Sequence, residues 1–341
     1  MYKISLNDLD KLFEAISKNE SLYIPVDSVN GAEFKKYEEG MKLSSALNTN
    51  RSAKDFFFPQ TESMFDFKVS DKSFDIIDKR RECEDFVIFG VRACDARSFT
   101  ILDKVFLSDP VDTYYQNRRS HGTIVSVACG RPEETCFCQS FGINPAKPEG
   151  DASAWICADE LFITANTPKG EKLIESLSSV LSECSDDTVN QVITAIETIL
   201  PKLPLAKVNF ENMKSTELLE HFNNEKWGEL SEACIGCGTC TFVCPTCQCY
   251  DIREFDAGNS IKKFRCWDSC MYSDFTKMAH GNPRTSQKER FRQRFMHKLV
   301  YFPDNNNGEF GCVGCGRCLA KCPISMNIVK VEKALEVSAN E

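Results

Sequence analysis

Two copies of one cysteine motif near the C-terminal end constrain this chain more than any other feature. They read CIGCGTCTFVCP at 234–245 and CVGCGRCLAKCP at 312–323. Three thiolates at three-residue spacing can hold one face of an iron–sulfur cube, whereas the fourth cysteine, which precedes proline, serves the other cluster. The pattern therefore predicts two [4Fe-4S] clusters. The predicted ligands are Cys234, Cys237, Cys240 and Cys322 for cluster one, and Cys312, Cys315, Cys318 and Cys244 for cluster two.

Zinc sites and disulfides are the alternatives for these cysteines. Zinc needs only four ligands in two CxxC halves, which leaves the third and fourth cysteine of each run unexplained. Disulfides need an oxidising compartment. Nineteen cysteines follow a charged N-terminal stretch that does not resemble a secretory signal, so we expect a cytoplasmic protein whose cysteines bind a cofactor.

Length and charge narrow the range of functions. The 341 residues suffice for two domains, and a hydrophobic content of 42% is ordinary for a chain that buries a core. The formal charge of −9 argues against a nucleic-acid partner, since phosphate binding requires a basic surface. No apolar run approaches the ~18 residues that span a bilayer, so we expect no direct membrane insertion.

The N-terminal region, residues 1–205, is predicted to be an α/β domain with a mixed or mainly parallel sheet. Continuous apolar runs at 86–91 and 123–127 suit parallel strands covered on both faces. Shorter patterns predict a strand at 21–26, a hairpin at 152–165 and helices over 6–16, 172–181 and 188–200. Asp95 is expected to cap the helix that follows the first apolar run, and Phe56–Phe58 before Pro59 to be buried against the sheet.

Both apolar runs end in cysteines, and a CxC pair follows the second. Because open α/β sheets place ligands beyond the carboxyl ends of their strands, these thiols are expected to lie at one sheet edge. They predict a third [4Fe-4S] cluster, with zinc or unligated core cysteines as alternatives. Its predicted ligands are Cys94, Cys129, Cys136 and Cys138. Cys83, Cys157 and Cys184 stand alone and are expected to be packing residues.

Residues 245–311 separate the two motifs, far more than a compact bacterial ferredoxin places there. We expect this spacer to be helical and residues 206–341 to form an α-helical two-cluster ferredoxin domain, with a helix opening at Ser215. The basic stretch 284–298 places Phe291, Phe295 and Leu299 at helical spacing. It is expected to pack this stripe inward and to set its charges near the anionic clusters or an acidic partner, with RNA binding as a weaker alternative. The spacer cysteines leave a further metal site open; they are Cys247, Cys249, Cys266 and Cys270.

The order of these motifs resembles a known family. The segments are RACD at 92–95, TCFCQSFG at 135–142, CPTC at 244–247, WDSC at 267–270 and CVGCGRC at 312–318. They resemble the iron–sulfur chain of anaerobic sulfite reductase, the beta chain of the sulfhydrogenases and related subunits of flavin-linked heterodisulfide reductase complexes, over nearly the whole sequence. The resemblance implies an electron-transfer subunit of anaerobic metabolism beside a flavin- and NAD(P)-binding reductase subunit, which carries FAD, and a catalytic or further iron–sulfur subunit. It also supports the third cluster.

The predicted function is therefore one-electron relay, with no catalysis by the chain alone. Glycines between the ligands free backbone N–H groups for the cluster sulfurs, and Arg92 and Arg317 are candidates for nearby positive charge, unless they are solvated. The alternative is a self-contained iron–sulfur oxidoreductase with substrate at the N-terminal cluster. The chain has no G-x-G-x-x-G after a strand and no P-loop, so a flavin or NAD site within it is unsupported.

Overall fold

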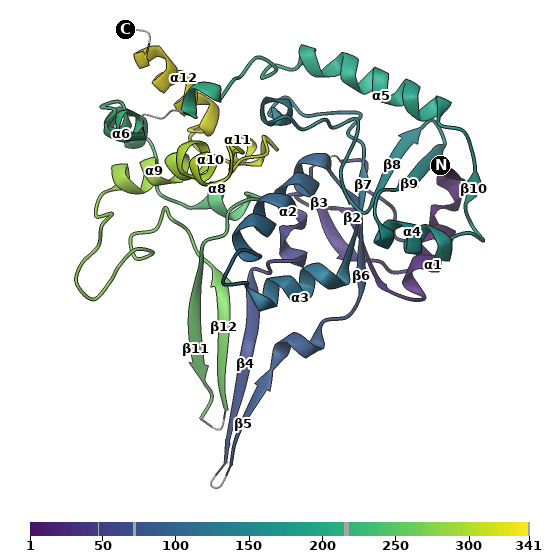
Figure 1. Ribbon diagram of the computed structural model, residues 1–341, viewed down its shortest axis with the longest axis horizontal. Coiled ribbons are helices and arrows are strands. Elements are labelled where there is room, and N and C mark those ends of the chain that lie inside the picture. Colours follow the sequence, from purple (N-terminus) through teal and green to yellow (C-terminus); the bar gives the residue numbers. More distant parts are fainter. Residues whose placement is uncertain (47, 71–72, 215–217, 259, 340–341) are drawn as a thin grey trace. The chain divides into compact units, whose positions relative to one another are not determined.

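The computed structural model describes residues 1–46, 48–70, 73–214, 218–258 and 260–339 (Figure 1). The chain forms two compact units, each discontinuous in sequence. The first unit comprises Met1–Phe57, Glu82–Lys207 and the short segment Val313–Cys315. The second unit comprises Phe58–Arg81, Val208–Cys312 and Gly316–Glu341.

An eight-stranded mixed sheet forms the centre of the first unit. Its strand order is β10-β1-β9-β8-β7-β6-β2-β3, and β2, β6, β7 and β8 run parallel to their neighbours within that group. The bounds are β1 (Tyr2–Ser5), β2 (Ser21–Ser28), β3 (Gly31–Lys36), β6 (Phe86–Val91), β7 (Gly122–Val127), β8 (Ala152–Cys157), β9 (Glu160–Ala165) and β10 (Ser182–Glu183). β6 and β7 are buried along their whole length, as continuous apolar strands must be.

Helices cover both faces of this sheet (Figure 1). They are η1 (Leu6–Asp8), α1 (Leu9–Ser17), η2 (Ala53–Phe56), α2 (Ala93–Phe106), α3 (Thr113–His121), η4 (Cys138–Phe141), α4 (Pro168–Ser176), α5 (Asp187–Ile199) and η5 (Leu200–Lys202). Val87 and Phe89 of β6 join the core beneath α1 and α4. On the other face Phe57 lies 4.8 Å from Phe99 of α2 and 5.8 Å from Phe86, ring centre to ring centre. Each such side chain contributes roughly 1.5–3 kcal/mol by leaving water.

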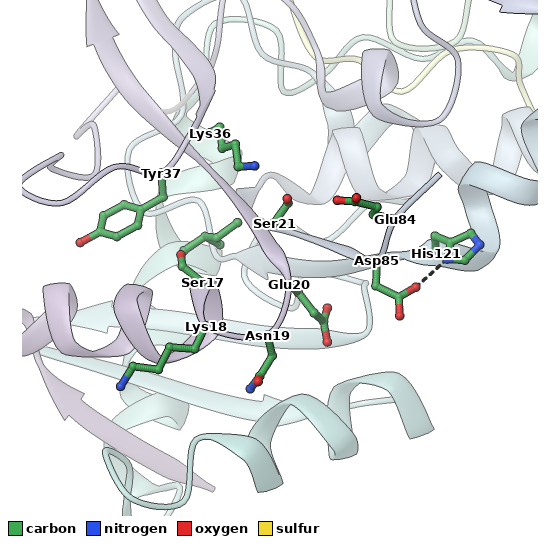
Figure 2. Close-up of a pocket in the computed structure, with 11 residues that line it drawn as sticks. Ser17, Lys18, Asn19, Glu20, Ser21, Lys36, Tyr37, Glu84, Asp85 and His121 are labelled. Atoms are coloured by element: carbon green, nitrogen blue, oxygen red, sulfur yellow. Dashed lines mark hydrogen bonds and ion pairs between the residues drawn. The ribbon is translucent and has the colours of Figure 1, made fainter. Parts of the chain in front are cut away.

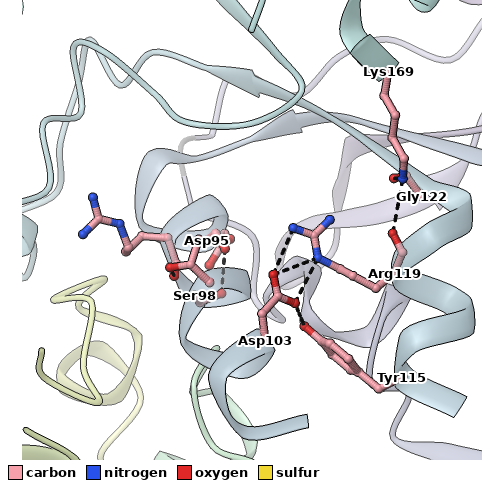
Figure 3. A network of polar contacts seen from close by, with 9 residues as sticks. Asp95, Ser98, Asp103, Tyr115, Arg119, Gly122 and Lys169 are labelled. Atoms are coloured by element: carbon pink, nitrogen blue, oxygen red, sulfur yellow. Dashed lines mark hydrogen bonds and ion pairs between the residues drawn. The ribbon is translucent and has the colours of Figure 1, made fainter. Parts of the chain in front are cut away.

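A polar network joins α2, α3 and α4 to one another and, through Lys169, to the start of β7 (Figure 3). Tyr115 Oη donates to Asp103 at 2.7 Å, and Arg119 Nε donates to the same carboxylate at 3.1 Å. Lys169 Nζ donates to the carbonyl of Gly122 at 2.8 Å, at the start of β7. The Asp103 charge is thus paired and hydrogen-bonded, which offsets the cost of its partial burial.

The second unit contains a four-stranded antiparallel sheet built from two long hairpins (Figure 1). Its order is β11-β12-β4-β5, with β4 (Thr61–Ser70), β5 (Ser73–Asp78), β11 (Tyr250–Asp256) and β12 (Ser260–Trp267). At the buried end of the sheet Arg265 Nε donates to Glu62 at 2.6 Å, and its guanidinium lies 5.2 Å from the Phe58 ring centre. The ion pair is fully enclosed, because the two side chains are 2% and 4% exposed.

The other elements of the second unit are helices. One of them, η3 (Lys79–Glu82), directly follows β5. The others are η6 (Glu211–Met213), α6 (Leu218–Asn223), α7 (Trp227–Glu232), α8 (Thr239–Phe242), α9 (Gln287–Met296), the π-helical turn η7 (His297–Tyr301), α10 (Phe302–Asn305), α11 (Arg317–Ala320) and α12 (Ile328–Ala339). A capping box between Ser286 and Glu289 begins α9. Phe291 and Phe295 of α9 pack on Trp227, as the helical stripe predicted.

The predicted fold class is confirmed, with corrections inside it. The prediction that the spacer is helical holds for α9 and α10 but is wrong for Tyr250–Asp256 and Ser260–Trp267, which form β11 and β12. The cap prediction is also wrong: α2 begins at Ala93 behind Arg92, and Asp95 lies buried in its first turn. Sequence patterns did not indicate β1, β3, α3 or the hairpin of β4 and β5. The helix expected to open at Ser215 starts outside the described residues, and the domain boundary at 205/206 stays a prediction.

Candidate iron–sulfur sites

The thiols of the first unit gather at the carboxyl ends of two neighbouring parallel strands. Cys94 follows β6 in the first turn of α2, and Cys129 follows β7. The loop beyond Cys129 returns Cys136 and Cys138 to it, since the charge of a Cys129 thiolate is close enough to raise the pKa of both. Arg92 lies beside Cys94 and Cys129. The structure thus brings the four predicted ligands of the third cluster to one sheet edge.

Burial changes the acidity of two of these thiols. Burial is the main cause that raises the pKa of the Cys136 thiol to about 11 and that of Cys138 to about 12. Such thiols stay protonated until a metal takes the place of the proton, because metal binding requires the thiolate. Arg92 donates to the carbonyls of Ala128 and Ala46 at 3.4 and 3.3 Å, which fixes its guanidinium beside the thiols.

The predicted ligands of cluster one line a single cavity of the second unit. Cys234, Cys237, Cys240 and Cys322 surround it. Its other walls are mainly apolar and include Met271, Phe291, Phe295 and Met326. Four thiols around a partly open cavity with mainly apolar walls are suitable surroundings for an iron–sulfur cube.

The two motifs repeat one backbone geometry. Gly236 and Gly238 have φ angles of +66° and +72°, and Gly314 and Gly316 have +59° and +77°. Gly238 and Gly316 are in turn the N-caps of α8 and α11, so each motif enters a short helix through a left-handed glycine. A side chain at these positions would strain the backbone, which explains why both runs alternate cysteine with glycine.

Three of the predicted ligands of cluster two gather around buried positive charge in the second unit. Cys244 is buried and lies beside Lys298 and Cys318, and Cys312 is also close to Lys298. Burial lowers the pKa of Lys298, but these neighbouring thiolates raise it overall. The fourth predicted ligand, Cys315, is buried and belongs to the first unit.

The further spacer cysteines form thiol pairs. Cys247 hydrogen-bonds Cys244, and Cys249 hydrogen-bonds Cys270. Cys266 lies on β12 and is half-buried. In the part of the chain that the structure describes, no three cysteine, histidine or acidic side chains converge on one metal-ion position.

One buried donor tests whether a cluster fits the cavity of the second unit. Arg294 lines this cavity and is 4% exposed, yet its buried Nε has no hydrogen-bond partner among the residues that the structure describes. An unpartnered buried N–H of a cation costs free energy unless an acceptor reaches it. The sulfides and thiolate sulfurs of a bound cluster are such acceptors, so the residues present fit the group.

The sequence indicated part of this environment. It placed positive charge of the 284–298 helix near the clusters, and Arg294 and Lys298 are the residues that lie there. Arg317 is 3% exposed, so the solvated alternative is wrong for it. Asn48 was missed: its Nδ2 donates to Cys136 Sγ at 3.8 Å and to the Cys315 carbonyl at 3.2 Å. A lone loop asparagine carries no sequence signal for such a role.

An open hollow elsewhere in the first unit has no part in these sites. Its volume is about 680 Å³, and it lies at the amino ends of β2 and β6, where Ser21 and Asp85 are found (Figure 2). His121 Nδ1 contacts Asp85 at 2.6 Å there. The thiols lie at the carboxyl ends of the parallel strands.

In the described chain, no helix combines the length and apolar character needed to cross a membrane.

The cysteine arrangement defines a two-cluster iron–sulfur protein, and residues 233–326 match the 4Fe-4S dicluster domain family. Over 329 residues the chain is 30% identical to sulfhydrogenase 2 subunit beta of Pyrococcus furiosus, covering 94% of each chain. The chain belongs to the sulfhydrogenase beta subunit family. It carries two [4Fe-4S] clusters and is an iron–sulfur electron-transfer protein. No solved structure matches it significantly.

Proposed function

We propose that the chain relays single electrons between a flavin- and NAD(P)-binding reductase subunit and a catalytic partner. The relative is named as one subunit of an enzyme, which supports the proposal that this chain functions in a complex with other subunits. In this proposal an α/β domain, residues 1–205, holds a third cluster through Cys94, Cys129, Cys136 and Cys138. A ferredoxin domain, residues 206–341, holds the other two with the ligand sets given above.

The observation that carries the proposal is a direct link between two predicted ligand loops. The amide of Asn48 touches both Cys136 Sγ and the carbonyl of Cys315, at 3.8 and 3.2 Å. Beside it the Phe137 N–H donates to the carbonyl of Gly314 at 2.9 Å. Asn48 thus bridges a predicted ligand of the third cluster and one of cluster two, and the Phe137–Gly314 hydrogen bond joins the residues next to them.

Gly314 permits this close approach. A Cβ at Gly314 would lie 2.4 Å from the carbonyl oxygen of Phe137, and its φ of +59° disfavours other residues. The backbone of one cysteine motif therefore lies directly against the backbone of the other ligand loop. A relay needs its clusters to lie close together, and contacts between the ligand loops favour that.

The clusters, when bound, supply reversible one-electron transfer with little structural change. The chain's own residues hold them and exclude water. Cys244 and Cys315 are buried, and Phe291 and Phe295 form part of the wall at cluster one. Only Cys237 among the twelve predicted ligands is exposed, which makes it the natural point of electron exchange with a partner.

The link is tested by replacing Asn48 with alanine. One electron is injected into the anaerobic protein by flash photoreduction, and freeze-quench EPR follows its redistribution between the clusters. We expect slower redistribution in Asn48→Ala. The matched control is Asn50→Ala in the same loop, whose amide instead donates to the Asn30 carbonyl. Equal rates in both variants would contradict a relay through Asn48.

The partner is tested with NAD(P)H. We expect no cluster reduction by NAD(P)H in the purified chain and rapid reduction once a flavoprotein that co-purifies with it is added. NAD(P)H oxidation by the chain alone would instead support a self-contained oxidoreductase.

A further inference from the structure

Two buried cations of one helical segment point into the cluster region of the second unit. Arg294 lies on α9 and Lys298 on η7, and they are 4% and 6% exposed. Lys288, on the same helix, is exposed. Cations are almost never buried unless they are paired, so the two inward charges need anionic neighbours.

Arg294 stands between the predicted ligands of both C-terminal clusters. It lines the cavity of Cys234, Cys237, Cys240 and Cys322. It also hydrogen-bonds the sulfur of Cys318, a predicted ligand of cluster two. Its Nε remains without a partner in the described structure and is buried. One guanidinium can therefore act on both clusters.

Lys298 lies beside two predicted ligands of cluster two, Cys244 and Cys312. Its Nζ donates to Thr246 Oγ1 at 2.8 Å and to the Gly311 carbonyl at 3.1 Å. Thr246 Oγ1 lies 3.3 Å from Cys244 Sγ, and Gly311 directly precedes Cys312. The Thr246 hydroxyl therefore lies between the ammonium and Cys244 Sγ, and the carbonyl that binds the ammonium belongs to the residue before Cys312.

The π-helical turn contributes to this placement. Lys298 is the second residue of η7, where the helix widens after Met296. Gly311 allows a close approach, since a Cβ there would lie 3.3 Å from the Lys298 Cα. Single π-helical turns occur frequently at functional sites.

We propose that Arg294 and Lys298 are fixed positive charges that set the reduction potentials of the two C-terminal clusters, Arg294 for both and Lys298 for cluster two. The inference rests on the ligand sets of the proposed function. Reduction adds one electron and no atom to a cluster that is already anionic. A buried cation beside it favours the reduced form, because charges interact strongly where water is excluded.

The test is an EPR-monitored redox titration of the anaerobically purified full chain, with no partner present. We expect Arg294→Gln to lower the potentials of both clusters and Lys298→Met to lower only one. Each shift should change the reduced-to-oxidised ratio at fixed potential by at least tenfold, which is about 59 mV for a one-electron couple. Arg294→Lys keeps the charge and should retain most of the potential. Lys288→Met removes a charge from the exposed face and should change nothing.

The readouts separate this inference from the relay. Unchanged potentials in Arg294→Gln and Lys298→Met, with about eight iron atoms retained in the dicluster region, would overturn the tuning role while leaving the relay intact. If Arg294→Gln fails to retain its clusters, Lys298→Met and Arg294→Lys decide the matter: equal potentials in these two variants would contradict the proposal. The rate of electron redistribution in Asn48→Ala, which tests the relay, does not depend on these potentials being measured.

Discussion

The two units gather their thiols in different ways. In the first unit the four cysteines come from two segments, the first turn of α2 and the connection between β7 and β8, and they meet because β6 and β7 are parallel neighbours. In the second unit most of them come from short local runs with left-handed glycines. The charges differ as well: Arg92 is half-buried, whereas Arg294 and Lys298 are buried. A local motif can be recognised in sequence, but a site assembled by a sheet depends on the whole fold.

The largest expected effect is the loss of iron when a predicted ligand of the first unit is replaced. Cys136→Ala should remove the cluster of the first unit, about four iron atoms, and leave the EPR signals of the dicluster region in place. Cys157→Ala on β8, a residue expected only to pack, is the matched control and should keep all the iron. Iron and acid-labile sulfide analysis checks both. Equal iron content in the two variants would show that Cys136 is not a cluster ligand.

A second prediction concerns what supports the dicluster region. Glu62→Gln leaves Arg265 buried without its counter-charge, and loss of one partner of a buried pair costs about 3–5 kcal/mol. Denaturant unfolding should show a loss of this size. The control is Asp251→Asn, which breaks the Arg253–Asp251 pair on the same sheet, where the side chains are 61% and 46% exposed; there we expect less than about 1 kcal/mol. Similar losses in both would show that burial does not distinguish the pairs.

The smallest effect is a pH dependence within the second unit. Burial, with smaller contributions from Lys298 and Arg284, lowers the pKa of His297 to about 4. The usual value is about 6.5, so the unfolded chain takes up the proton first as pH falls. Stability is therefore fully present above about pH 6.5 and declines towards pH 4, by up to about 3 kcal/mol.

This pH effect is measured as the difference in unfolding free energy between pH 7 and pH 5. His297→Gln should flatten the pH dependence, whereas substitution of the exposed His280 by Gln should leave it as in the wild type. A wild-type slope in His297→Gln would mean that other groups, the cluster ligands among them, cause the acid sensitivity.

The sequence predicted the elements whose patterns are local. The apolar strands β6 and β7, the hairpin of β8 and β9, and the stripe of α9 are present in the structure where periodicity placed them. It failed where pairing over long distances decides. The spacer is predicted to be helical from its sequence, but within it β11 and β12 pair with each other, and β12 also pairs with β4, nearly two hundred residues earlier in the chain.

The same rule applies to the sites. The cysteines themselves could be chosen from spacing and from their place after strands. Their neighbours could not: Asn48 contacts Cys315 across most of the chain, and the inward direction of Lys298 depends on a π-helical turn. Such contacts follow from packing, which a single sequence does not reveal.

Iron content of the intact chain tests the central claim most directly. The account predicts that anaerobically purified protein holds about 12 iron atoms and an equal amount of acid-labile sulfide, the content of three cubes. A value of about eight, unchanged by Cys136→Ala, would contradict a third cluster and with it the proposed relay from the third cluster to cluster two.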